Sequence, residues 1–234
     1  MSNMSKKKEE EKKFQEKDQH LEEVNEGLST VGLWIEKHSA VLSWTITAIV
    51  VVICGIIALN QYVFKPKALE ASDENAKAVV YFMAGDFEKA LNGDDAECIG
   101  FQEIADSYKM YQPGKLAALY AGICYYQLGE YEEAAKYLKK FSAKDLTIDP
   151  AASQLLGDTY VEMEEYGKAI SAFEAAAKSG NDLIAPMSLK KAGFVYLEQG
   201  NKKAAKKAFE TIKNDYPTSV EAQDIEKYIA IAAE

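Results

Sequence analysis

Residues 115–141 read KLAALYAGICYYQLGEYEEAAKYLKKF, and their pattern of small and aromatic residues recurs along the chain. The pattern places small and aromatic residues at fixed offsets: Gly122, Tyr125, Gly129, Tyr131 and Ala134. Two further copies begin at Gly157 and Gly193, separated by steps of 35 and 36 residues, and an earlier copy begins at Ala78. A period of about 34 residues is typical of stacked helix-turn-helix units. The sequence therefore predicts an all-α solenoid.

Each copy divides into two short helices. In the first helix of 115–141, the apolar residues recur at helical spacing and share one face: Tyr120, Ala121, Cys124, Tyr125 and Leu128. Gly122 has no side chain, so the partner helix can approach closely there. Gly129 stands where the first helix must end, a position that favours a left-handed backbone. We interpret these repeated residues as core packing and exclude them from the candidate binding site.

The repeated residues resemble the tetratricopeptide repeat. Two positions depart from its pattern, because Glu164 replaces the turn glycine and Lys202 replaces the turn aromatic. We expect about four repeats at residues 71–111, 115–145, 150–180 and 186–217, followed by a capping helix in 218–234. Thr218 and Glu221 form a T-x-x-E capping box that would open this last helix.

The segment from Ser39 to Phe64 contains 26 residues without a charge. As a helix rising about 1.5 Å per residue, it is long enough to cross a bilayer core of about 30 Å. Trp44 near one end and Tyr62 near the other match the aromatic residues found at membrane interfaces. The sequence therefore predicts a tail at 1–38, a transmembrane helix at 39–64 and a repeat domain at 65–234.

The tail and the repeat domain differ in charge. The tail holds seven lysines, which favours a cytoplasmic N-terminus. Its apolar residues are spaced as in a short amphipathic helix: Leu21, Val24, Leu28, Val31 and Ile35. That helix would lie on the membrane, pair with a partner helix or simply extend the anchor. Residues 66–234 hold 19 lysines and 28 acids, so this domain lacks the basic surface of nucleic-acid-binding proteins.

The sequence contains no motif for catalysis, cofactor binding or metal binding. Both histidines, His20 and His38, precede the predicted membrane segment, so the repeat domain lacks the commonest general base and metal ligand. We therefore expect a protein that is not an enzyme. Cys98 and Cys124 could pair in an oxidising compartment, but the place of Cys124 on a buried helix face favours a packed thiol.

The order of parts resembles a known family. The segments that carry the resemblance are WIEKHSAVLSW at 34–44, YVFKPKALEA at 62–71 and GDFEKALNGD at 85–94, followed by the repeats. Together they resemble the YfgM-like ancillary subunits of the bacterial Sec translocon, in the tetratricopeptide version common in Bacteroidota. The resemblance implies a single-pass inner-membrane protein with a periplasmic C-terminal domain. It also implies association with Sec translocon subunits and transfer of secreted polypeptides to periplasmic chaperones.

Tetratricopeptide arrays bind extended or helical peptides along the concave face formed by the first helix of each repeat. Counting along the repeats predicts the side chains that face this groove: Phe82, Leu119, Ile123, Tyr126, Gln154, Asp158, Lys190 and Phe194. The alternative is that several of them pack against the capping helix or the insertion at 92–111. Two other functions stay open: a homo-oligomeric scaffold in envelope assembly or division, and an organelle-anchored adaptor with cytosolic repeats.

Overall fold

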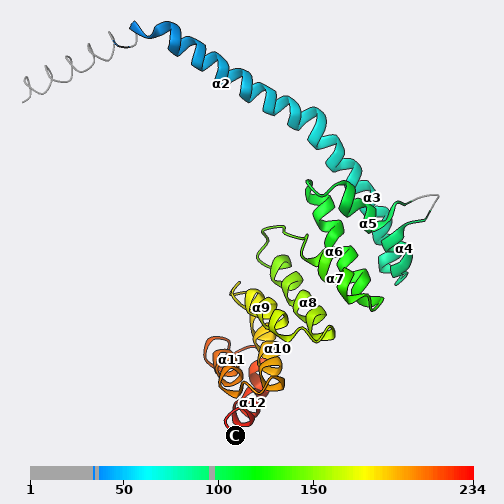
Figure 1. The fold of residues 1–234 in the computed structure, drawn as a ribbon, viewed down its shortest axis with the longest axis vertical. Helices are drawn as coiled ribbons and strands as arrows, with labels where there is room; N and C mark the ends of the chain where they lie inside the picture. Colours follow the sequence, from blue (N-terminus) through cyan, green and yellow to red (C-terminus); the bar gives the residue numbers. More distant parts are fainter. Residues whose placement is uncertain (1–33, 35–36, 95–97) are drawn as a thin grey trace, which may run out of the picture. The chain divides into compact units, whose positions relative to one another are not determined.

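The computed structural model describes Trp34, residues 37–94 and residues 98–234 (Figure 1). The chain divides into two compact units, one that ends at Tyr62 and one that comprises Val63–Glu234. The amphipathic helix predicted from Leu21 to Ile35 lies outside the described residues.

The first unit contains the apolar helix α2, Ser39–Leu59, which is followed by the π-helical turn η1, Asn60–Phe64. The helical run that begins at Ser39 is long and apolar enough to cross a membrane, with a mean hydropathy of 2.5 in its most apolar stretch. None of that stretch is buried inside the structure. Such a surface is unfavourable in water and favourable in lipid.

The second unit consists of helix pairs, as the repeat pattern predicts. The pairs are α3 (Lys65–Met83) with α4 (Phe87–Asn92), α6 (Gln112–Gln127) with α7 (Tyr131–Leu138), α8 (Ile148–Glu162) with α9 (Tyr166–Ala177), and α10 (Ile184–Glu198) with α11 (Lys202–Asp215). An additional helix, α5 (Gly100–Ser107), lies between the first two pairs, and η2 (Val220–Asp224) with α12 (Ile225–Ile231) ends the chain. The prediction of an all-α repeat fold is confirmed.

The close approach predicted between paired helices is present in the last three pairs. A glycine of the first helix faces a large side chain of the second: Gly122 with Leu138, Gly157 with Phe173 and Gly193 with Phe209. A Cβ atom added to these glycines would lie 2.7, 2.5 and 2.2 Å from the facing side chain. Each glycine therefore makes room for the apolar residue that fills the crossing.

The turns inside the pairs share one backbone conformation. Gly129 has a φ of 79°, as predicted for the end of its helix, and Gly85 and Gly200 have φ values of 77° and 68°. Glu164 occupies the same place in the α8–α9 turn with a φ of 58°. The third repeat therefore keeps the left-handed turn with a residue that has a Cβ atom.

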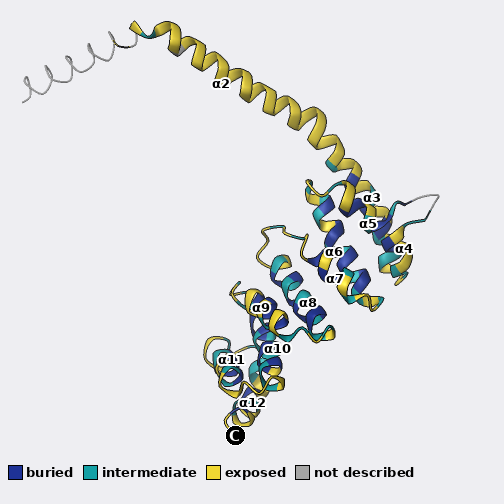
Figure 2. Cartoon of the chain, in the orientation of Figure 1, coloured by how far each residue is buried: buried dark blue, intermediate teal, exposed yellow. Residues whose placement is uncertain are grey.

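The capping segment packs as predicted but begins differently. Ile225 and Ala232 are buried against α11, and Tyr228 and Ile229 pack on the same cluster. In Figure 2 the buried parts of the helix pairs are dark blue. The predicted capping box at Thr218 is wrong, because Ser219 is the N-cap and its Oγ accepts a hydrogen bond from the Ala222 amide at 3.2 Å. The segment begins with a turn of 3-10 helix, which shifts the cap by one residue.

Candidate protein-binding face

Three of the predicted groove residues lie on one face of α6. Leu119, Ile123 and Tyr126 are spaced four and three residues apart and are all half-buried. The Tyr126 ring contacts the ring of Tyr131, with 5.6 Å between centroids. The Tyr126 side chain is therefore held in place, and part of the apolar surface of all three residues stays accessible. We call this set the α6 face.

The α6 face adjoins the next repeat through Tyr126. Burial raises the pKa of the Tyr126 hydroxyl, and the carboxylates of Asp158 and Glu162 on α8 raise it further. Asp158 in turn accepts two hydrogen bonds from the Lys191 Nζ, at 2.8 and 2.6 Å. The structure thus brings the predicted residues Tyr126 and Asp158 into one neighbourhood. Lys191, which the sequence reasoning missed, links them to α10.

The predicted residues of α10 contact the capping segment. The Lys190 Nζ donates to Asp224 at 2.6 Å and lies 5.1 Å from the centre of the Tyr228 ring. Phe194 is 40% exposed, and its ring packs edge-on against Tyr228 with 4.8 Å between centroids. Lys190 and Phe194 therefore follow the alternative prediction, in which groove residues pack against the capping helix. The spacing of the last helix already predicts that Tyr228 faces the repeats, whereas Asp224 lies outside both patterns and could not have been identified.

Of the remaining two predicted residues, Phe82 is half-buried and Gln154 is buried. Phe82 packs against Phe101 of α5 and Tyr120 of α6, with ring centroids 6.3 and 5.1 Å away. This contact corresponds to the alternative that the insertion covers part of the groove. Gln154 is only 6% exposed. Among the predicted residues, the three on α6 form the largest set on one helix with accessible apolar surface.

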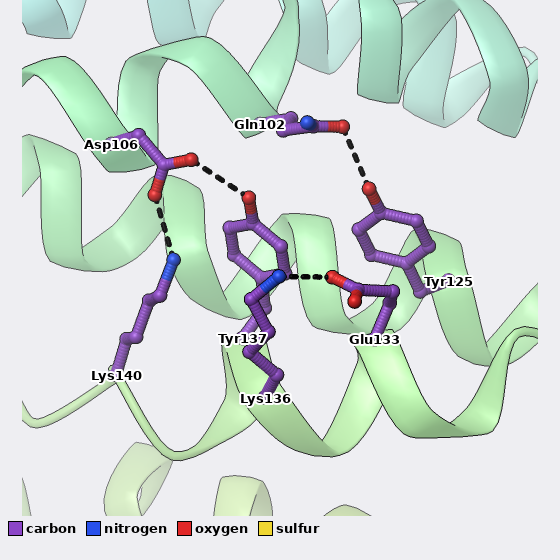
Figure 3. A network of polar contacts seen from close by, with 7 residues as sticks. All are labelled: Gln102, Asp106, Tyr125, Glu133, Lys136, Tyr137 and Lys140. Atoms are coloured by element: carbon purple, nitrogen blue, oxygen red, sulfur yellow. Dashed lines mark hydrogen bonds and ion pairs between the residues drawn. The ribbon is translucent and has the colours of Figure 1, made fainter.

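A polar network holds the inserted helix α5 against α6 and α7 (Figure 3). The Tyr125 hydroxyl donates to Gln102 Oε1 at 2.6 Å, and the Tyr137 hydroxyl donates to Asp106 Oδ2 at 2.9 Å. The Lys140 Nζ donates to the other oxygen of Asp106 at 2.7 Å. The repeat pattern predicts only that the two tyrosines are packed. Their hydroxyl partners lie on α5, which has no counterpart in the other repeats.

The electrostatics of this network favour a structural role. Burial raises the pKa of the Asp106 carboxyl, but the hydrogen bonds from Lys140 and Tyr137 outweigh it and leave the pKa below its usual value. Burial and the hydrogen bond to Asp106 raise the pKa of Tyr137 well above its usual range. At neutral pH the carboxylate is therefore ionised and the hydroxyl is neutral, as the observed hydrogen bonds require.

The cysteines of the repeat unit are buried free thiols. Burial raises the pKa of Cys124 to about 12, and it also raises the pKa of Cys98. A thiol that stays protonated at neutral pH is a poor nucleophile. Within the described residues, no group of three histidine, cysteine, aspartate or glutamate side chains is placed to hold a metal ion.

Comparisons with known proteins agree with this architecture. Two tetratricopeptide-repeat models match the chain, one at residues 116–145 and 189–219 and the other at residues 150–179. A search of the curated proteins finds no match.

Solved structures with a similar fold include two of MamA. One, titled "Crystal structure of MamA protein", is 22% identical and has a TM-score of 0.50, with 71% of this chain and 90% of that chain covered. The other, titled "MamA AMB-1 P212121", is 17% identical and has a TM-score of 0.52, with 70% and 81% covered. At these identities the likeness concerns the fold alone. The chain thus carries tetratricopeptide repeats, whose general role is to bind other proteins.

Proposed function

We propose that this protein is a membrane-anchored adaptor that binds a protein or peptide through the α6 face. The observation that carries the proposal is the set of three half-buried apolar side chains, Leu119, Ile123 and Tyr126, on one side of α6. Apolar side chains held in place by their neighbours bind a partner without a large loss of conformational entropy. The Asp158–Lys191 pair beside them supplies polar groups that would orient the bound segment.

The anchor in this proposal is the apolar helix that begins at Ser39. Its length and composition suit a bilayer, and the lysines of the tail favour a cytoplasmic N-terminus. The repeats would then lie in the periplasm of a bacterial cell. The resemblance to YfgM-like subunits supports a place beside the Sec translocon, where the adaptor would pass emerging polypeptides to periplasmic chaperones.

Substitutions on the α6 face test the binding site. We expect Ile123→Asp and Tyr126→Asp to abolish capture of partners from native membranes, because a charge on this face opposes burial of an apolar segment. Val80→Asp is the matched control, since Val80 is exposed on α3, outside the α6 face. Helical content should be the same for all three variants, and each should stay folded at the temperature of capture, although Tyr126→Asp loses the ring contact with Tyr131. Capture that survives both α6 substitutions would exclude this face.

Purification of the tagged full-length protein in mild detergent tests the partner. Mass spectrometry of the copurifying proteins would be compared with that of a variant carrying an unrelated transmembrane helix. Translocon subunits that disappear with the exchanged helix would support the proposal and assign their recognition to the anchor. Recovery of envelope-assembly or division proteins without the translocon would favour the oligomeric scaffold instead.

Membrane topology needs a new exposed cysteine. Cys98 is buried and Cys54 lies within the apolar helix, so neither is a suitable target for an aqueous reagent. Met83→Cys places a thiol at an exposed position of the repeat unit. A membrane-impermeant maleimide should label this variant in cells whose outer membrane alone is permeable. Labelling only after lysis of the inner membrane would contradict a periplasmic repeat unit.

A further inference from the structure

The loops between successive repeats carry a row of exposed apolar side chains. Met110, Leu146, Leu183 and Val220 follow one another at steps of 36, 37 and 37 residues, just before α6, α8 and α10 and at the start of η2. They are 77, 80, 67 and 73% exposed. We call these four residues the loop row. Single exposed apolar side chains are common, but their recurrence at the same place in three successive loops and at the start of η2 indicates an interaction surface.

The loop row lies along one edge of the repeat unit. The first helices of stacked repeats run in the same direction, so the loops that precede them share an edge with the start of α3. Two contacts agree with this placement. The ring of Phe64, directly before α3, lies 6.0 Å from the ring of Tyr111 in the loop before α6. The Asn181 side chain, two residues before Leu183, donates to the Leu146 carbonyl at 3.4 Å.

This edge is also the one at which the chain leaves the apolar helix. Phe64 is the last residue of the uncharged segment, and Lys65 follows it. An aromatic residue followed by lysine at the end of a membrane helix lies at the level of the lipid headgroups. Because Tyr111 contacts Phe64, the loop that contains Met110 lies at the same level. In the anchored protein proposed above, the loop row would therefore begin at the membrane surface.

The charges on this edge are mixed: Asp182 and Glu221 lie next to Leu183 and Val220 in the sequence, but three lysines are available to anionic lipid. Lys109, Lys144 and Lys178 lie in the loops, and the described part of the chain offers none of them a carboxylate within ion-pair distance. The two acids of the loop between α7 and α8 accept hydrogen bonds from backbone amides instead. Asp145 accepts from the Thr147 and Ile148 amides at 2.8 Å, and Asp149 accepts from the amides of residues 143 and 144 at 2.9 and 3.0 Å.

The opposite edge, formed by the turns within the pairs, has the opposite character. In the first three repeats it carries a series of acids: Asp86, Glu88, Glu130, Glu132, Glu133, Glu162, Glu164 and Glu165. In these three repeats an anionic bilayer therefore repels the turn edge more strongly than the loop edge, even though Lys89, Lys136 and Lys168 pair with some of the acids. This difference favours the loop edge as the one that faces the lipid.

We propose that the loop row lies on the surface of the bilayer that holds the anchor. The four apolar side chains enter the headgroup region, and the loop lysines face anionic lipids. This inference rests on the anchoring proposed above, and it adds a second membrane contact that runs along the whole repeat unit. The acidic turn edge then faces away from the membrane.

Fluorescence quenching by lipid tests the proposal. The full-length protein with Cys54→Ser would carry Leu183→Cys labelled with a small fluorophore, since Cys98 and Cys124 are buried and react slowly. It would be reconstituted in vesicles of phosphatidylethanolamine with phosphatidylglycerol as the minor lipid, with and without a nitroxide on the headgroup. Glu132→Cys, on the turn edge, is the matched control. We expect quenching at position 183 to exceed that at position 132 by about twofold or more.

The outcomes separate the loop row from the anchor. In parallel, the wild-type protein labelled at Cys54 would be quenched by a nitroxide on the lipid chains if the anchor is inserted. If Cys54 is quenched but positions 183 and 132 are quenched equally, the membrane contact of the loop row is overturned and the anchor stands. If Cys54 is not quenched, both proposals are overturned. Protection of position 183 from iodide without quenching by lipid would assign the row to a second copy of the chain and also overturn the proposal.

A second variant tests whether the side chains themselves make the contact. Leu146→Ser with Leu183→Ser changes only exposed positions, so the melting temperature should stay the same. A fluorophore at Val220→Cys, in the last loop, should then lose most of its quenching by lipid. Unchanged quenching at position 220 would show that the apolar row does not hold this edge on the membrane.

Discussion

The first repeat and the last three repeats share the pattern of their first helix but differ in their second helix. In the last three, a glycine of the first helix meets a large residue sixteen positions later, as Gly193 meets Phe209. In the first repeat the corresponding residues are Ala78 and Asp94, and Asp94 accepts a hydrogen bond from the Tyr81 hydroxyl. Its second helix, α4, has six residues, compared with 8, 12 and 14 in α7, α9 and α11. The first repeat therefore lacks the apolar residue that closes the other crossings.

The inserted helix α5 supplies what the first repeat lacks. Phe101 is fully buried and stacks on Tyr120 of α6, with 4.8 Å between ring centroids. Ile104 and Ala105 extend the same core, and the Asp106 and Gln102 side chains hydrogen-bond α7 and α6. A repeat can thus depart from its consensus when a neighbouring segment restores the buried apolar surface. The following predictions test this comparison in order of expected effect.

The largest effect should come from Phe101→Ala. Truncation of a fully buried phenylalanine removes apolar surface that is buried on folding and leaves a cavity. We therefore expect a loss of about 3–5 kcal/mol in the free energy of unfolding. Phe209→Ala, in the last repeat, should lose a similar amount. Urea unfolding of the full-length protein in detergent, followed by circular dichroism, measures both. A loss at Phe101 below about 1 kcal/mol would mean that α5 is not part of the core.

A smaller effect should come from a methyl group added at a crossing. In Gly193→Ala the new Cβ atom would lie 2.2 Å from the Phe209 ring, so overpacking should destabilise the fold by about 1–3 kcal/mol. Gly167→Ala is the matched control, because its Cβ atom would meet nothing within 4 Å and lies in the first turn of α9. We expect this control to be neutral or slightly stabilised, since alanine favours helix. The melting temperature of Gly193→Ala should lie below that of the wild type, and the melting temperature of Gly167→Ala should equal or slightly exceed it.

An effect of about 1 kcal/mol in the opposite direction is expected at the third turn. Glu164 has a left-handed φ of 58°, where a side chain is strained and glycine is not. Glu164→Gly should therefore stabilise the protein by about 0.5–1 kcal/mol. Gly129→Glu, in the second repeat, should destabilise it by a similar amount. If both variants lose stability, contacts of the Glu164 side chain outweigh the strain of its backbone.

The sequence predicted the features that recur in each repeat and did not predict those that depend on α5 or the capping segment. The repeated spacing predicted the left-handed Gly129 and the close approach at Gly122, because both depend on residues within one repeat. It could not predict the partners of Tyr125 and Tyr137, since these lie on α5, which no other repeat contains. It selected Lys190 and Phe194 by their helix face, whereas the position of the capping segment that covers them depends on packing at the end of the chain. The α6 face remains as the part of the predicted groove that no added segment covers.

The smallest effect should be a change in the pH dependence of stability at α5. The pKa of Asp106 lies below its usual value in the folded protein, because the hydrogen bonds from Lys140 and Tyr137 outweigh its burial. A carboxyl group with a lowered folded pKa stabilises the fold above the unfolded pKa of about 4 and loses that contribution as the pH falls through the folded value. Since the Asp106 side chain is 53% exposed, the contribution should be only about 0.5 kcal/mol.

Asp106→Asn should therefore lose stability at neutral pH and match the wild type more closely in acid. Glu132→Gln, at an exposed position of α7, is the control and should not change the pH profile. A uniform loss at every pH would indicate that the packing of α5, and not the charge of Asp106, holds the insertion on the second repeat.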